Sequence, residues 1–208
     1  MLLSTWLLFV AVALVSIASP GPAFLVAVRN GMAGGAKRVA LSSLGNITGL
    51  LILASAAVLG LGVVLNASEV LFNLLKLGGA AYLIYLGIRQ WRSNTSLAVS
   101  TSPAKPTPRW RTVSEGILVA MSNPKAILFF TALFPQFLDT QRALLPQFSI
   151  MIGTFMALSF VTLMTYGTLA KHLARWLSSR SRVTWVNRLM GSAFIGLGLS
   201  ILRLRQPV

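Results

Sequence analysis

Six long apolar stretches run through this chain, and they constrain its fold more than any other feature. Each is long enough to cross a bilayer, which takes ~20 helical residues at a rise of ~1.5 Å per residue. Only a helix can satisfy the backbone amides of such a stretch in lipid. The sequence therefore predicts an all-α polytopic membrane protein with about six transmembrane helices. The expected spans are 3–28, 39–65, 70–90, 114–137, 144–170 and 184–202.

The composition fits lipid rather than water as the solvent. Hydrophobic residues make up 55% of the 208 residues and charged residues only 10%, whereas soluble domains are about 25% charged. Cysteine is absent, and the chain has one histidine and three acidic residues. This scarcity excludes disulfides and metal clusters rich in His, Cys or carboxylate. No histidine, cysteine or carboxylate lies at clear mid-membrane depth, so we expect neither an enzyme nor a bound cofactor or metal.

Basic residues gather in alternate loops. Of the 18 lysines and arginines, 13 lie in the loops after the first, third and fifth spans, and the loops and terminus of the other side hold three. The basic loops are expected to face the cytoplasm, which accounts for the net charge of +15 without a nucleic-acid partner. Both termini then face outward. The two arginines of the C-terminal end leave open a missing or re-entrant span.

A stretch rich in Ser, Thr and Pro divides the chain. We expect a cytoplasmic linker over 93–112, joining half-repeats 1–92 and 113–208 of one transmembrane domain, 1–208. The first and fourth spans both contain a proline motif, and the third and sixth share a glycine-containing pattern. Because each half has three spans, related halves must be inverted in the membrane, which is typical of secondary transporters.

The two proline motifs predict interrupted helices at bilayer depth. Two prolines and a glycine within four residues cannot continue a regular helix, and Asn followed by Pro is typical of a helix start. A helix start inside the membrane turns unpaired amides and a partial positive charge inward, which suits a carboxylate. The alternative is a pair of proline kinks repaired by neighbouring helices. The expected substrate-binding residues of these motifs are Ser19, Pro20, Gly21, Pro22, Asn123, Pro124 and Lys125.

Three further interpretations concern single polar residues. Lys125 within a span costs roughly 2.5–3.5 kcal/mol on insertion scales, so it is expected to pair with a substrate carboxylate or to change protonation during coupling; snorkelling to the interface is the alternative. Glu115 is a second coupling candidate, although the favoured interpretation is a capping box from Thr112 to Glu115. Asn46 lies between two glycines that permit close helix packing, and it lines the cavity or bonds between helices.

At these motifs the sequence resembles the LysE/RhtB superfamily of lysine and homoserine/threonine exporters. The resemblance covers nearly the whole chain. It rests on the Pro-Gly-Pro run at 20–22, the turn at 29–35, the stretch Lys76–Leu83 and, most specifically, 123–130 continuing to 134–137. It implies a six-span, multi-pass exporter of amino acids in a bacterial cytoplasmic (inner) membrane, driven by the proton gradient and homodimeric.

The scarcity of acidic residues bears on the substrate. A cationic amino acid such as lysine would lack an obvious intramembrane carboxylate, so neutral amino acids such as homoserine, threonine or an aliphatic residue are expected instead, although helix C-termini and carbonyls can also receive an ammonium group. Two alternatives stand beside this interpretation. A metal-cation exporter of related architecture would need clustered ligands inside the spans. A non-transport membrane scaffold would leave Lys125 beside a broken helix without a role.

Overall fold

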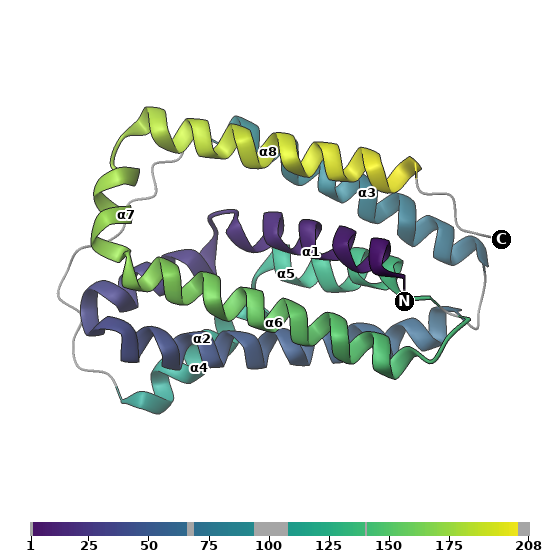
Figure 1. Cartoon of the computed structure of the whole chain (residues 1–208), viewed down its shortest axis with the longest axis horizontal. Coiled ribbons are helices and arrows are strands. Elements are labelled where there is room, and N and C mark those ends of the chain that lie inside the picture. The colour runs from purple at the N-terminus through teal and green to yellow at the C-terminus, as the bar shows by residue number, and fades with distance from the viewer. Residues whose placement is uncertain (1, 66–68, 94–107, 140, 204–208) are drawn as a thin grey trace.

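The computed structural model describes residues 2–65, 69–93, 108–139 and 141–203, and within these ranges the chain forms helices and no strands (Figure 1). In chain order the elements are α1 (Leu3–Ala18), α2 (Pro22–Leu65), α3 (Glu69–Arg92), α4 (Arg109–Met121), α5 (Pro124–Leu128), the π-helix η1 (Phe129–Leu133), the 3₁₀-helix η2 (Phe134–Phe137), α6 (Leu144–Thr168), α7 (Ala170–Leu177) and α8 (Arg180–Arg203). The all-α prediction is confirmed for these residues.

Most helices lie along one direction and form two groups. One group is the pair of α3 and α8, and the other is α2 with α4 and α6 packed against it (Figure 1). The helix α1 and the segment α5–η2 lie between the groups, where α1 contacts both α6 and α8 and η1 contacts both α2 and α3. The helix before the first proline motif, α1, and the helical segment after the second, α5–η2, are therefore internal, and the longer helices surround them.

The basic segments gather at one end of the molecule, as the sequence predicts. The turn of α2, the last residues of α3, the first residues of α4 and all of α7 lie at that end, whereas the start of α1 and the last described residues of α8 lie at the other (Figure 1). The turn of α2 occurs at Gly35, whose φ of 63° and ψ of −163° divide this helix into two parts. A residue with a side chain rarely adopts such a φ, so glycine is required there.

Two of the span and linker boundaries expected from the sequence differ in the structure. The first expected span is divided between α1 and the part of α2 before Gly35, because the chain breaks between them. The helix α4 begins at Arg109, which lies inside the linker expected over 93–112, and its N-cap is Pro108. Residues 94–107 of the expected linker lie outside the described residues.

Length and composition identify fewer spans than the sequence predicts. Among the described residues, Pro22–Gly60 and Leu144–Thr168 are each long and apolar enough to cross a membrane. The bent pair Arg109–Met121 and Pro124–Phe137, with 54° between its parts, qualifies when taken as one span. The helix α1 is apolar but has only 16 residues. The proline motifs explain the short helices α1 and α4, because each motif ends its helix before that helix is long enough to cross the bilayer.

Glycines bring the helices into close contact. A Cβ placed on Gly45 would lie 2.0 Å from the carbonyl oxygen of Val113, and one on Gly49 would lie 2.8 Å from the carbonyl oxygen of Ile117. No real Cβ lies this near, so α2 and α4 approach as closely as they do only because these positions are glycine. The predicted role of the Gly45–Gly49 pair in close packing is thus confirmed.

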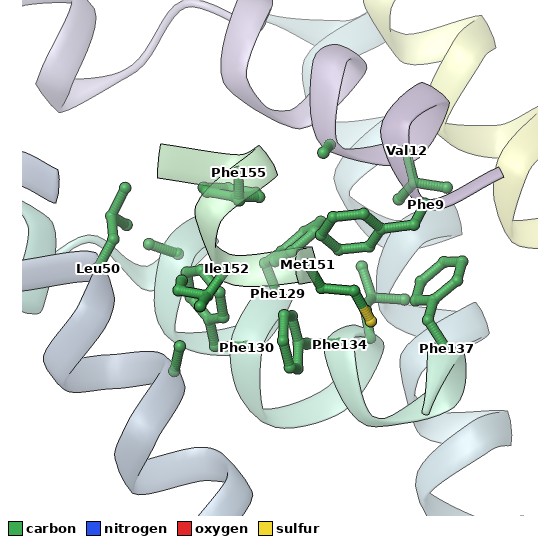
Figure 2. Packing of buried hydrophobic residues seen from close by; sticks show 14 of the residues in the cluster. Phe9, Val12, Leu50, Phe129, Phe130, Phe134, Phe137, Met151, Ile152 and Phe155 are labelled. Atoms are coloured by element: carbon green, nitrogen blue, oxygen red, sulfur yellow. The ribbon is translucent and has the colours of Figure 1, made fainter. Parts of the chain in front are cut away.

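A cluster of phenylalanines holds the two interrupted helices together. Phe9 of α1 packs against Phe129, Phe134 and Phe137, with ring centroids 5.4 to 6.2 Å apart (Figure 2). Phe155 of α6 lies 4.8 Å from the ring of Phe129. Such tilted and edge-to-face contacts are the favourable arrangements of aromatic rings. This packing fixes α1 beside the α5–η2 segment and so brings the two proline motifs to the same depth.

Candidate functional site

The first break lies between α1 and α2. The helix α1 ends at Ala18, and Ser19 follows with an extended backbone, although its N–H still bonds to the carbonyl oxygen of Val15 at 3.1 Å. The new helix begins at Pro22, and the carbonyl of Gly21 accepts its first backbone bond, from the N–H of Leu25 at 3.1 Å. The proline at the first helical position is therefore Pro22, since Pro20 lies in the connection.

The second break has the predicted form of a capped helix start. Asn123 is the N-cap of α5, and its side-chain oxygen accepts a hydrogen bond of 3.1 Å from the backbone N–H of Lys125. Pro124 occupies the first turn, where its missing N–H costs nothing. The interpretation of Asn123 and Pro124 as a helix start within the fourth expected span is confirmed.

Lys125 joins the two breaks. Its Nζ donates hydrogen bonds to the carbonyl oxygens of Ser16, at 2.6 Å, and Ser19, at 2.8 Å. These carbonyls end α1, where backbone acceptors lack helical partners and the helix dipole places partial negative charge. Lys125 therefore takes part in an internal charge-assisted contact between the two halves of the chain, instead of extending to the membrane surface.

A small cavity lies beside this contact and brings together five of the eight predicted site residues. Its volume is about 40 Å³. The predicted residues in its lining are Ser19, Gly21, Asn46, Asn123 and Lys125. Most of the remaining wall is apolar and includes Phe24, Leu50 and Phe155. The cavity therefore combines a polar end at the breaks with apolar walls, as binding pockets for small molecules do.

A second and larger cavity, of about 600 Å³, also adjoins the breaks. Pro20, Pro22 and Pro124 line it, together with Ser19, Gly21, Asn123 and Lys125 from the first cavity. It extends along α3 to the basic end of the molecule, since Arg89 and Arg92 are also in its lining. Every predicted residue of the two proline motifs thus lines at least one cavity, and four of them lie between the two.

The structure contradicts the capping-box interpretation of Glu115. Because α4 begins at Arg109, Glu115 lies in its second turn, beyond the reach of a cap. Its carboxylate instead forms an ion pair with the guanidinium of Arg29 on α2. Glu115 is absent from the described lining of both cavities, so the ion pair links α2 to α4 outside the site.

Among the residues at the site that were not predicted, Ser159 and Tyr166 both lie on α6. The hydroxyl of Ser159 donates to the side-chain oxygen of Asn46 at 3.4 Å, inside the first cavity. The hydroxyl of Tyr166 donates to the carbonyl oxygen of Ala18, at the end of α1, at 3.0 Å. Asn46 thus both lines the cavity and bonds between helices. The helical spacing of the buried face of α6, on which Ser159 lies, is the signal that could have indicated Ser159.

Two helices broken at the same depth, facing a common cavity within an apolar helical protein, define a membrane transporter. The chain belongs to the LysE type translocator family, whose sequence model matches residues 14–205. This family membership confirms the resemblance found in the sequence, and it identifies the protein as a transporter rather than an enzyme.

Named relatives cover almost the whole chain. An uncharacterized membrane protein of Vibrio cholerae is 35% identical over 198 residues, covering 93% of this chain and 94% of the relative. The homoserine/homoserine lactone efflux protein of Salmonella typhi is 33% identical over 193 residues, covering 93% of each chain. The leucine efflux protein of Klebsiella pneumoniae is 27% identical over 204 residues, covering 97% of this chain and 96% of the relative. No solved structure matches the chain.

Proposed function

We propose that this protein is a proton-coupled secondary transporter that exports neutral amino acids, such as homoserine, threonine or an aliphatic residue, across a bacterial inner membrane. The observation that carries the proposal is the contact of Lys125 with the carbonyls of Ser16 and Ser19 between two cavities. The names of two relatives, a homoserine/homoserine lactone efflux protein and a leucine efflux protein, support amino acids as the cargo and export as the direction.

The groups at the break suit the charged ends of an amino acid. The ammonium of Lys125 and the backbone amides of Ala23 and Phe24, in the first turn of α2, offer donors to a carboxylate. The carbonyls of Ser16 and Ser19 are acceptors, and an amino-acid ammonium can share them with Lys125. Donors and acceptors therefore lie within one small site, as recognition of a zwitterion requires.

The walls of the first cavity suit a neutral side chain. Apolar groups such as Ile17, Leu50 and Leu163 face an aliphatic or small side chain, while Asn46 and Ser159 offer a hydrogen bond to a hydroxyl. No acidic residue is in the described lining, so the side-chain ammonium of lysine would be desolvated without a counter-ion, which is costly. Neutral amino acids are favoured for this reason.

The helix pairing supports two inverted half-repeats within a six-span protein. Counting the broken helices as single spans, the first half contains α1, α2 and α3, and the second contains α4–η2, α6 and α8. The second span of one half packs on the second of the other, as α2 on α6, and the third on the third, as α3 on α8. A two-fold axis between the halves would place equivalent elements near it against each other in this way, and rocking of such halves about a central site gives alternating access.

Proton coupling and a homodimeric assembly form part of the proposal and rest on the family resemblance. Of the two coupling candidates, Lys125 faces both cavities, whereas Glu115 is held in an ion pair outside their described lining. A metal-cation exporter is disfavoured, because residues 2–65, 69–93, 108–139 and 141–203 contain no group of three or more His, Cys, Asp or Glu that could hold a metal ion.

The test is an export panel in a bacterial strain that overproduces the chain. Cells are loaded with labelled homoserine, threonine, leucine or lysine, and the loss of label is followed with and without a proton uncoupler. We expect faster loss of at least one neutral amino acid than from vector-control cells, and that this difference disappears with the uncoupler. If no amino acid leaves faster than from the control, the proposed function is wrong.

A further inference from the structure

The lining of the larger cavity contains two positively charged side chains in addition to Lys125, the residue that joins the two breaks. Its described lining contains Arg89, Arg92 and Lys125 but no acidic residue. Lys125 is bonded to backbone carbonyls, whereas Arg89 and Arg92 form no ion pair or hydrogen bond through their side chains with any described residue. A cleft lined by one sign of charge attracts ligands of the opposite sign.

Arg89 is placed on the same face of α3 as residues that reach the breaks. Tyr82, Leu86 and Arg89 follow one another at spacings of four and three residues, so all three face the cavity. The hydroxyl of Tyr82 lies 3.5 Å from the carbonyl oxygen of Pro124, beside the second break. Arg89 is seven residues further along α3, so it lies roughly 10 Å nearer the basic end.

The end of α3 that carries Arg89 is held firmly against α8. The side chain of Gln90 donates a hydrogen bond of 2.7 Å to the side-chain oxygen of Asn187, and the side chain of Asn187 donates one of 2.9 Å to the backbone carbonyl of Ser93. Asn187 is almost fully buried. These bonds tie the backbone next to Arg89 to α8, which is the kind of support that positions a binding residue.

From this geometry we propose that Arg89 forms a separate carboxylate-binding site at the basic mouth of the larger cavity, where an amino acid binds before it reaches Lys125. The inference rests on the proposed function and adds an entry site to it. A guanidinium binds a carboxylate through two parallel hydrogen bonds, and this geometry is specific for a free carboxylate. Arg89 should therefore distinguish an amino acid from its lactone or ester, which lack a carboxylate.

Everted membrane vesicles test the site, because their outer face is the cytoplasmic one and export appears as uptake. Initial uptake of labelled homoserine and leucine, together with any further amino acid identified by the export panel, is measured over a range of concentrations for the wild type and for Arg89→Gln. The loss of a charge-assisted pair should raise KM about tenfold or more, with the rate at saturation changing less than about twofold. Homoserine lactone, tested as substrate and as competitor, should show an unchanged affinity.

Two further variants separate carboxylate binding from other effects. Arg175→Gln removes the same charge from an exposed residue at the same end of the molecule, outside the described lining of both cavities, and should leave KM unchanged. Arg89→Lys keeps the charge but loses the paired geometry, so its KM should lie between those of the wild type and Arg89→Gln. Arg89→Lys also tests the proposal if Arg89→Gln does not accumulate in the membrane.

The outcomes separate this inference from the proposed function. An unchanged KM for the amino acids in Arg89→Gln, with wild-type uptake intact, would overturn the entry site and leave the exporter in place. An equal loss of affinity for the lactone would also overturn it, since Arg89 would then act on the fold rather than on a carboxylate. Absence of uptake by the wild type would contradict the proposed function itself.

Discussion

The ammonium group of Lys125 lies 2.6 Å from the backbone carbonyl oxygen of Ser16, a residue 109 positions earlier in the chain. A second bond, of 2.8 Å, reaches the carbonyl of Ser19. A lysine at this depth is costly unless its charge is satisfied, and the open end of α1 supplies the acceptors. The same contact leaves two carbonyls without partners if the lysine is removed, so Lys125 bears on both stability and transport.

Replacement of Lys125 by methionine should abolish export. The variant keeps the length of the side chain but removes the donor to Ser16 and Ser19 and the cation that faces both cavities. The rate of amino-acid loss from loaded cells should fall by roughly 10- to 100-fold, the effect of losing one or more hydrogen bonds to a charged group. Lys171→Met is the matched control, because Lys171 is exposed on α7 and is absent from the described lining of both cavities. Full activity of Lys125→Met at normal abundance would show that neither folding nor transport depends on Lys125.

Replacement of Asn123 by alanine should weaken the start of α5. The variant loses the side-chain oxygen that accepts from the N–H of Lys125, and loss of an N-cap costs about 1 kcal/mol. We expect a lower unfolding midpoint of the purified protein in detergent and a reduced transport rate. Asn123→Asp or Asn123→Ser restores a capping oxygen and should recover most of the midpoint. If alanine leaves both quantities unchanged, the cap is not what sets the position of Lys125.

Replacement of Gly45 by alanine should destabilise the contact between α2 and α4. A Cβ at this position would lie 2.0 Å from the carbonyl oxygen of Val113, so the helices must separate. Overpacking of this kind costs about 1–3 kcal/mol. Gly153→Ala is the control, since no heavy atom lies within 4 Å of its added Cβ, and alanine favours a helix more than glycine does. Thermal unfolding should separate the two variants, and an equal midpoint would contradict the close packing.

Replacement of Glu115 by glutamine should leave export and its sensitivity to an uncoupler nearly intact. Glu115 pairs with Arg29 and is absent from the described lining of both cavities, and both side chains are more than 30% exposed. An ion pair of this exposure contributes about 0–1 kcal/mol. Export rates should stay within about twofold of the wild type, and the charge-reversed double variant Arg29→Glu/Glu115→Arg should match it. Export that persists in Glu115→Gln but no longer responds to the uncoupler would instead assign the coupling proton to Glu115.

Short sequence patterns predicted the structure correctly where that structure depends only on neighbouring residues. Asn123 followed by Pro124 predicts a helix start, and the structure has one there with the predicted cap. The interpretation of Glu115 failed because a capping box is defined by four residues, whereas the actual N-cap of α4 is Pro108, about one turn before Thr112. The ion pair that Glu115 forms with Arg29 spans 86 positions, which no local pattern could indicate.

The sequence by itself determined that this is an all-helical chain for a lipid environment, with basic segments at one end and two helices interrupted by proline. These properties follow from hydropathy, charge and backbone chemistry, which act on each segment separately. Only the tertiary structure decided that Lys125 bonds to the end of α1, that Ser159 joins Asn46 in the cavity and that Arg89 faces the larger one. Such contacts depend on which helix faces pack together, and packing is a property of the whole chain.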